Sequence, residues 1–153
     1  MGYIENNLVS GEDIVYKANV HWFIFVPGAS VFVIGIILFS GGAESGGSAW
    51  GRLAILFAIF LLVKAFIVKI STELAVTSKR IIAKAGLIRR NTVELNHGKV
   101  ESFNISQSIF GRIFGYGTLV VNGTGGGKTP ISSIDSPLEF RKMAMETIDD
   151  SQA

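Results

Sequence analysis

The glycine-rich stretch Gly123–Thr129 (GTGGGKT) is the part of the sequence that most closely resembles a motif with a chemical function. A Walker-type phosphate-binding loop requires G-x-x-x-x-G-K-[ST] between a strand and a helix, because the amides at the start of that helix hold the phosphates. Counting back from Gly127 and Lys128, the first glycine would have to stand where Asn122 stands. Pro130 follows directly and begins a run that is typical of a strand. The stretch therefore predicts the tip of a β-hairpin and no nucleotide site.

Other residues that could support catalysis or bind a metal are scattered along the chain. The sequence contains no cysteine, which excludes a disulfide, a thiolate zinc site and a cysteine nucleophile. His21 and His97 lie far apart and belong to no metal-binding spacing. The carboxylates Glu94, Glu101 and Asp135 form no pair that suggests acid–base catalysis. We expect no catalytic residue, no metal site and no cofactor, and hence a protein that is not an enzyme.

The composition indicates a membrane protein. Of the 153 residues, 48% are hydrophobic and only 17% are charged, which is too apolar for an ordinary soluble domain. Two apolar runs, 22–39 and 53–70, would each cover about 27 Å as a helix, close to the thickness of a bilayer core. The glycine- and serine-rich loop 40–52 joins them. We therefore expect a transmembrane hairpin over residues 22–70, with Trp22 and Trp50 as interfacial anchors.

Lys64 lies within the second apolar run. A lysine at the centre of a span costs about 2.5–3.5 kcal/mol, whereas each large apolar residue returns about 0.3–0.6 kcal/mol, so the apolar neighbours outweigh it. Lys64 also lies about 9 Å along the helix from Ile70, within reach of the interface for a snorkelling ammonium. The alternative is that Lys64 lines the path of an oligomeric pore or transporter.

Charge asymmetry predicts the orientation of the hairpin. The loop carries Arg52 beside Glu44, whereas most basic residues near the spans lie on the other side of the membrane. By the positive-inside rule, both termini face the cytoplasm. The expected organisation is a cytoplasmic segment 1–21, the hairpin, a cytoplasmic domain 71–149 and a tail 150–153.

The chain after Ile70 is typical of a small antiparallel sheet. Short runs rich in β-branched residues alternate with glycine and polar turns that are too short for helical crossovers. The predicted strands are Glu73–Thr77, Arg80–Lys84, Leu87–Leu95, Lys99–Ile105, Thr118–Asn122 and Pro130–Ile134. The fold class is therefore α+β, with one antiparallel meander behind the hairpin.

Two helices are predicted within this region. Apolar residues at helical spacing in Ser106–Phe114, followed by Gly115, predict a short helix. Ser136 and Glu139 form a capping box for a helix that runs to about Ile148, with Phe140, Ala144 and Ile148 on the face that packs on the sheet.

Several motifs in this order resemble the bacterial pleckstrin-homology-like (PH-like) domains of the second type, found in small membrane proteins similar to the YdbS and YdbT group. The motifs are Ala75–Ile82, Gly86–Ile88, Ser106–Ser108, Gly111–Thr118 (GRIFGYGT) and Ile134–Pro137, together with Glu5, Leu8, Gly11, Glu12, His21 and Trp22 near the N-terminus. The resemblance implies a PH-like β-roll closed by a C-terminal helix, in a multi-pass protein of the bacterial inner (cytoplasmic) membrane. It implies a binding or scaffolding module and no enzyme.

Basic side chains are the candidate contacts for this module. The set is Lys69, Lys79, Arg80, Lys84, Arg89, Arg90 and Arg112. Each basic side chain near an anionic leaflet contributes about 1 kcal/mol, so the set could hold the domain against lipid headgroups; a solvated sheet face is the alternative. Membrane lipids, further copies of the chain in a homo-oligomer and a protein partner are the expected partners. Nucleic acid is not expected, because no aromatic stacking platform accompanies the charges.

Two further features bear on contacts. Phe110, Phe114 and Tyr116 surround Arg112, and we expect these aromatic side chains to belong to the core; a recognition surface or a membrane wedge is the alternative. Ala54 and Ala58 form a small-xxx-small pair that could mediate contact between copies.

Overall fold

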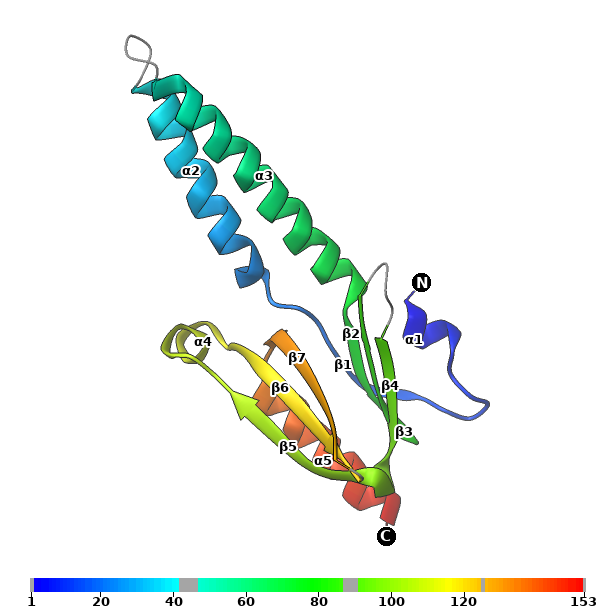
Figure 1. Ribbon diagram of the computed structural model, residues 1–153. Helices are drawn as coiled ribbons and strands as arrows, with labels where there is room; N and C mark the ends of the chain where they lie inside the picture. Colours follow the sequence, from blue (N-terminus) through cyan, green and yellow to red (C-terminus); the bar gives the residue numbers. More distant parts are fainter. Residues whose placement is uncertain (1, 42–46, 87–90, 125, 153) are drawn as a thin grey trace. The chain divides into compact units, whose positions relative to one another are not determined.

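The computed structural model describes residues 2–41, 47–86, 91–124 and 126–152, and the chain forms two compact units (Figure 1). The helical hairpin consists of Trp22–Lys69. The sheet unit combines Met1–His21 with Ile70–Ala153. The N-terminal segment thus belongs to the same unit as the strands that follow the hairpin.

The helical hairpin contains a short 3-10 helix η1 (Trp22–Phe25), α2 (Val26–Ser40) and α3 (Gly47–Ser71). The two helices approach closely at Gly35, where an added Cβ would lie 3.0 Å from the backbone nitrogen of Ile55. Ala58 is fully buried in the hairpin, and Ala54 lies close to Gly35. The predicted small-xxx-small pair therefore serves the contact between α2 and α3 of one chain, and the expectation that it joins two copies is not supported.

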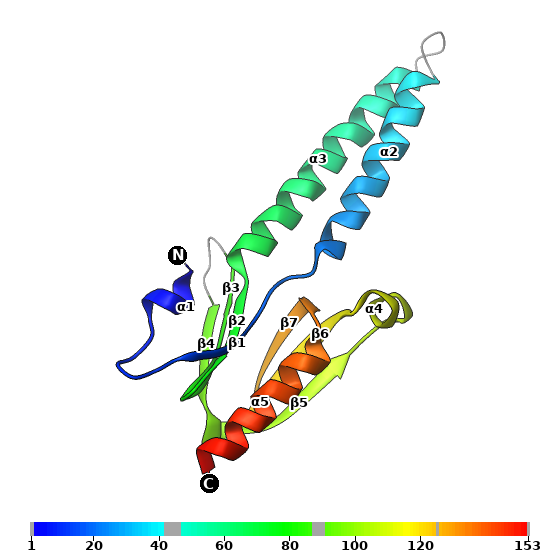
Figure 2. The same ribbon diagram turned by 180° about the vertical axis from the view of Figure 1, so that it is seen from behind.

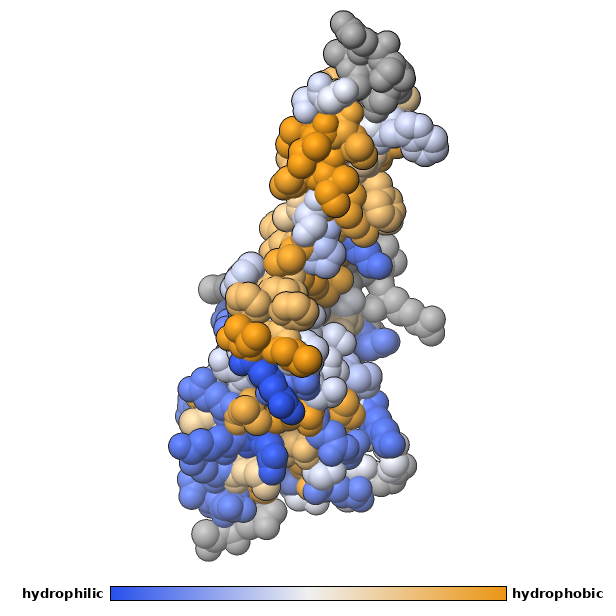
Figure 3. Space-filling model, turned by 90° about the vertical axis from the view of Figure 1, so that its left-hand side faces the viewer, coloured by the Kyte–Doolittle hydropathy of each residue, from blue (hydrophilic) through white to orange (hydrophobic). Residues whose placement is uncertain are grey.

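The outer surface of the hairpin is apolar. Within each of the two apolar helical segments, only 11% of residues are buried. Large side chains such as Ile37, Leu56 and Phe60 are exposed. Figure 3 shows hydrophobic residues covering most of the visible face of the hairpin. Among the described residues of the hairpin, the buried ones therefore lie in the narrow contact between its helices, and most of the apolar surface faces outward.

The sheet unit contains two antiparallel sheets. The first has the order β1-β2-β3-β4 and the second the order β5-β6-β7. Their bounds are β1 Ile14–Ala18, β2 Glu73–Thr77, β3 Arg80–Ala85, β4 Asn91–Asn96, β5 Val100–Ser106, β6 Tyr116–Gly123 and β7 Gly127–Asp135. The meander is confirmed within each sheet, but the predicted single sheet is wrong, because the 3-10 turn η2 (His97–Lys99) ends one sheet and begins the next.

Strand β1 lies before the hairpin in the sequence and pairs with β2, which follows it. The register places Lys17 opposite Ala75 and Ala18 opposite Leu74. The whole helical hairpin is therefore inserted into the connection between two neighbouring antiparallel strands. The chain leaves and re-enters the sheet unit at the same end of the first sheet, which we call the exit end.

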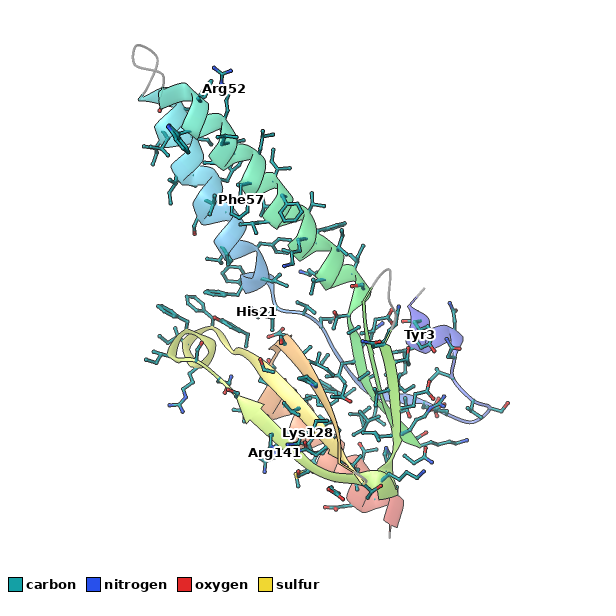
Figure 4. The ribbon with its side chains drawn as sticks, in the orientation of Figure 1. Tyr3, His21, Arg52, Phe57, Lys128 and Arg141 are labelled. Atoms are coloured by element: carbon teal, nitrogen blue, oxygen red, sulfur yellow. The ribbon has the colours of Figure 1, made fainter. Side chains whose placement is uncertain are left out.

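The segment after β1 joins the two sheets at the exit end. The amide of Asp135 donates to the carbonyl of Asn19 at 2.9 Å, and the amide of His21 donates to the carbonyl of Ser133 at 2.7 Å. Val20 forms an isolated antiparallel bridge with Ile134. Figure 4 labels His21 on this segment. The last residues before the hairpin thus extend the second sheet at β7.

Helix α5 (Pro137–Gln152) closes the sheet unit, as predicted. It lies against β1, β2, β5 and β6 (Figure 2). Phe140 and Ala144 are fully buried, and Ile148 is half-buried. The Tyr16 ring packs edge-on against Phe140 with 6.0 Å between centroids. The predicted apolar face of α5 is therefore the face that packs on the sheets.

Helix α1 (Tyr3–Asn6) covers a second face of the first sheet. Ile4 is fully buried with Ala75 of β2 and Ile82 of β3, and Leu8 and Ile14 pack around them. Strand β2 is consequently buried along almost its whole length. The N-terminal segment is therefore part of the fold of the sheet unit.

The described residues of the stretch Gly123–Thr129 form the predicted hairpin, and Gly125 lies outside the described residues. Gly123 of β6 pairs with Gly127 of β7, and Lys128 and Thr129 continue along β7. A strand stands where a Walker loop would need a helix, so the interpretation of GTGGGKT as a turn is confirmed.

We predict that Ile4→Ala lowers the free energy of unfolding of the sheet unit by about 2–5 kcal/mol, because the change leaves a cavity between α1 and the first sheet. Val9→Ala is the matched control, since Val9 is exposed in the same segment. Denaturant titration of the full chain in detergent, followed by hydrogen exchange of β2 amides, measures both changes. Equal effects of the two substitutions would show that α1 does not stabilise the sheet.

Candidate functional site

Helix α4 (Ile109–Phe114) is the surface feature of the sheet unit that stands out chemically. It begins at Ser108, whose Oγ accepts a hydrogen bond from the amide of Gly111 at 3.0 Å. It ends at Gly115, whose φ of 78° lies in the left-handed region that glycine adopts without strain. The predicted short helix and its end at Gly115 are confirmed, but the helix begins at Ile109, three residues after the predicted start at Ser106.

Helix α4 is held tightly against the start of β6. Gln107 Nε2 donates to the carbonyl of Tyr116 at 3.0 Å, which ties the residues before and after the helix together. Gly111 is the buried residue of α4, and an added Cβ there would lie 2.6 Å from the Tyr116 carbonyl. The close approach of the backbones fixes the helix in one position.

The large apolar side chains of α4 are exposed. The exposed fractions are 78% for Ile109, 62% for Phe110, 70% for Ile113 and 43% for Phe114. We call these four residues the α4 patch. The expectation that Phe110 and Phe114 belong to the core is wrong, because the inward face of this one-and-a-half-turn helix is occupied by Gly111 and leaves no room for larger side chains. Tyr116 is partly buried.

The α4 patch lies at the exit end of the sheet unit. Tyr116 follows α4 by two residues, and its ring stacks on the ring of His21 with 5.4 Å between centroids and 26° between planes. His21 is the last residue before the helical hairpin. The patch is therefore connected by one aromatic stack to the point at which the chain leaves the sheet unit.

A cavity of about 490 Å³ lies beside α4. Arg112 of α4 and Glu139 of α5 contribute its charged side chains, and the exposed side chain of Leu138 contributes apolar surface. Gln107, Gly115, Ser136 and Pro137 complete the lining. Arg112, predicted as a headgroup contact, is exposed. The exit end thus combines an apolar patch with an accessible guanidinium.

Arg80, another predicted headgroup contact, takes part in an ion-pair network inside the sheet unit. Its Nε and Nη2 each donate to the carboxylate of Glu12 at 2.9 Å, and its Nη1 donates to Glu94 at 2.7 Å. Thr77 Oγ1 also donates to Glu12, at 2.7 Å. The Glu12 side chain is fully buried. The guanidinium therefore holds the N-terminal segment on the first sheet.

Three other predicted basic residues also have partners within their own unit. Lys84 Nζ donates to Glu73 at 3.1 Å and lies over the ring of Tyr3. Lys79 Nζ donates to the carbonyl of Ser10 at 2.9 Å. In the helical hairpin, Lys69 Nζ lies 5.6 Å from the ring centroid of Phe25. The predicted contacts Arg89 and Arg90 lie outside the described residues.

The structure does not bring the predicted basic residues to one place. Lys79 and Arg80 stand at the turn between β2 and β3, whereas Lys84 pairs in register with Glu73 at the exit end. The length of β2 separates these two positions by about 13 Å. Their contact with lipid stays a prediction. Of the predicted residues that the structure describes, Arg112 has the most accessible place at the exit end.

Two carboxylates of the sheet unit, the buried Glu12 and the partly buried Glu73, have lowered pKa values. Burial alone would raise the pKa of Glu12, but hydrogen bonds from Thr77, the Val9 amide and Arg80 outweigh it and lower the pKa. At Glu73, burial would likewise raise the pKa, but hydrogen bonds from the Tyr3 amide, Lys84 and the Ile4 amide outweigh burial and lower it. Both groups are therefore held as carboxylates, which suits structural ion pairs and gives no general acid.

A second cleft, of about 510 Å³, lies between β3, β4 and β7. Lys84 and Lys128 contribute its basic side chains, and Thr92, Thr129 and Pro130 line it as well. Among the described residues, no group of histidines and carboxylates has the geometry of a metal site.

Comparison with known proteins gives one match. A family model described as "Bacterial PH domain" matches residues 23–147, which include both helices of the hairpin and all strands from β2 to β7. No curated protein and no solved structure matches the chain.

We predict that Arg80→Met destabilises the sheet unit by about 3 kcal/mol, because it leaves the Glu12 carboxylate buried without its partner. This value is the lower end of the usual range, since the Arg80 side chain keeps part of its surface exposed to water. The double variant Glu12→Gln, Arg80→Met should recover part of the loss. Lys142→Met, which breaks an exposed pair with Glu146, serves as the control and should cost less than about 1 kcal/mol. Chemical denaturation of the full chain measures all three variants.

The sheet unit should also lose stability in acid in two stages. Burial lowers the pKa of His97 below 6.5, so the unfolded chain binds a proton more readily, and stability falls as the pH drops below about 6.5. Glu12 and Glu73 have folded pKa values below 4.5, so their contribution is present above pH 4.5 and is lost as the pH falls through those values.

The measurement is the slope of unfolding free energy against pH. In Glu12→Gln, the slope below pH 4.5 should become shallower, whereas the slope between pH 6.5 and 4.5 should stay as in the parent protein. An unchanged slope below pH 4.5 would contradict the assignment of Glu12.

Proposed function

The chain belongs to the bacterial PH domain family, and from this premise we propose that it is a membrane-anchored binding module without enzymatic activity. PH-like domains are generally non-catalytic binding modules for lipids or proteins. We infer that the helical hairpin anchors the chain in the bacterial inner membrane and that the sheet unit works at the cytoplasmic face.

One observation carries the anchoring part of the proposal. The two apolar helical segments, Trp22–Ser40 and Ala49–Ser71, are long enough to cross a bilayer, and only 11% of each is buried. The core helix of a soluble domain would be mostly buried. A removed signal sequence would account for one helix near the N-terminus and not for the second. An exposed apolar surface of this length is stable in contact with lipid chains.

The place of the hairpin in the fold argues against its removal after synthesis. Strand β1 precedes the hairpin in the sequence, and its partner strand β2 follows the hairpin. Cleavage of the chain after α2 would cut the covalent link between the segment that contains α1 and β1 and the rest of the sheet unit. That segment includes the buried residues Ile4 and Glu12. A retained hairpin is consistent with an intact sheet unit.

Anionic phospholipid headgroups are the partner that we propose for the sheet unit. The exit end carries the exposed Arg112, and Lys84 lies at the same end of the first sheet. Basic groups close to an anionic leaflet gain about 1 kcal/mol each. The internal pairs of Lys84 and Arg80 reduce what these two can add, so the proposal gives Arg112 the larger share.

The rival function, an oligomeric pore or transporter, needs Lys64 from several copies to face an aqueous path. Lys64 is exposed on α3 beside a small cleft of about 200 Å³. Its neighbours there include Ile24, Leu61 and Val68, which give no polar lining for such a path. We therefore treat Lys64 as a snorkelling residue.

Self-association and a role as accessory subunit of a larger complex remain compatible with a binding module. Neither is favoured by a particular contact, since Ala54 and Ala58 serve the hairpin itself. The mass of the protein purified in mild detergent reports both, because it gives the copy number and any co-purifying partner.

The absence of cysteine allows a direct test of topology with single-cysteine variants. We predict that Ala49→Cys, beside the connection of the hairpin, reacts with a membrane-impermeant maleimide in cells whose outer membrane is permeabilised. Asp149→Cys, exposed on α5, should react only after the inner membrane is opened. The reverse pattern would invert the orientation, and labelling of both sites in intact spheroplasts would contradict a membrane-spanning hairpin.

A further inference from the structure

The α4 patch places large apolar side chains on the surface of the sheet unit. Four large apolar side chains project from a six-residue helix, and each is more than two-fifths exposed. Isolated apolar residues are common on protein surfaces, but a contiguous patch usually marks an interaction site. The remaining question is which partner the patch fits.

The patch is presented on a rigid support. The Ser108 cap, the Gln107 hydrogen bond and the close approach of Gly111 to Tyr116 fix α4 at both ends and along its inner face. A helix this short is not stable in water by itself. The supporting contacts therefore hold α4 in place and keep its apolar side chains on the surface. Without these contacts, the side chains could fold back onto the sheet.

The position of the patch favours a lipid surface over a second copy or a soluble partner. His21 stacks on Tyr116 and is followed directly by Trp22, the first residue of the apolar hairpin and an amphipathic ring of the kind found at membrane interfaces. The return of the chain, at Ile70 and Ser71, leads within two residues into β2. With the hairpin in a bilayer, these short connections would limit how far the exit end can move from the bilayer surface.

The charge next to the patch fits the same partner. Arg112 is the charged residue of α4 and is exposed. A helix that lies in the interface has aromatic and aliphatic side chains on one side and basic side chains that reach the headgroups. Glu139 lines the neighbouring cavity together with Arg112, and its negative charge partly offsets the positive charge of the guanidinium.

We propose that the α4 patch inserts into the headgroup and upper acyl region of the cytoplasmic leaflet, with Arg112 on lipid phosphate. This inference rests on the proposed function, because the hairpin must anchor the chain for the exit end to meet the bilayer. The patch acts as a second, shallow attachment that restrains the sheet unit on the membrane surface.

The test uses single-cysteine variants of the full chain, labelled with an environment-sensitive fluorophore and reconstituted into nanodiscs that contain phosphatidylglycerol and phosphatidylethanolamine. Ile113→Cys places the probe in the patch, Val33→Cys in the middle of α2, and Asp149→Cys on an exposed part of α5. Lipids with a nitroxide near the headgroup quench shallow probes, and lipids with a nitroxide near the chain end quench deep probes.

We expect the shallow nitroxide to quench the probe at Ile113→Cys, the deep nitroxide to quench the probe at Val33→Cys, and neither to quench the probe at Asp149→Cys. Adding Phe110→Asp to Ile113→Cys should reduce the shallow quenching, because it removes apolar surface and adds a charge to the patch. Circular dichroism of the full-length double variant checks that this exposed change leaves the fold intact.

The outcomes separate the two proposals. Quenching at position 33 without quenching at position 113 would overturn the insertion of α4 and leave the membrane anchor in place. No quenching at position 33 would overturn the proposed function and this inference with it. A shielded but unquenched probe at position 113, with disulfide cross-linking between Ile113→Cys chains, would assign the patch to a second copy and overturn the inference.

Discussion

The pairing of β1 with β2 is the constraint on which the rest of the structure depends. These strands are neighbours in the first sheet, yet the whole helical hairpin separates them in the sequence. Their pairing brings both connections of the hairpin to one end of the sheet unit. The short segment from Asn19 to His21 then crosses to β7, so the same pairing also joins the two sheets. Loss of this pairing would open one side of the core under α5, because β1 packs against that helix.

In the sheet unit, some charged residues form ion pairs that stabilise the fold, and others are exposed on the surface. Glu12 belongs to the segment before β1, and the buried pair that it forms with Arg80 fastens this segment to the sheet. Glu73 accepts hydrogen bonds from the amides of Tyr3 and Ile4 and from Lys84, and so fastens α1. At the exit end, Lys84 is therefore paired inside the fold. Among the residues that the structure describes there, the α4 patch and Arg112 are accessible for interaction.

The sequence pattern predicts the elements whose signals are local. Strand β2 matches its predicted bounds, α4 lies within the predicted stretch Ser106–Phe114, and α5 begins directly after the predicted Ser136. Strand β1 and the break between the two sheets were not predicted, because the partner of β1 lies beyond the hairpin and the break depends on how the sheets pack. The exposure of the α4 patch could not be read from periodicity either, since apolar residues at helical spacing fit a core and a membrane surface equally well. The replacement of a core side chain by Gly111 on the inner face becomes visible only in three dimensions.

A double attachment would explain why the sheet unit has shallow, open clefts and no deep pocket among the described residues. If the hairpin anchors the chain and the α4 patch rests on the leaflet, the sheet unit meets membrane ligands at an effective concentration set by short connections, which lies in the millimolar range for flexible links. A site that binds its ligand only weakly in solution would then be occupied at the membrane. On the proposal made above, the open cavity beside Arg112 would be a site of this kind, because it borders the α4 patch. The affinity of the isolated sheet unit would consequently understate its occupancy in the full chain, and the connection through β1 and β2 would be as important for binding as the residues that touch the ligand.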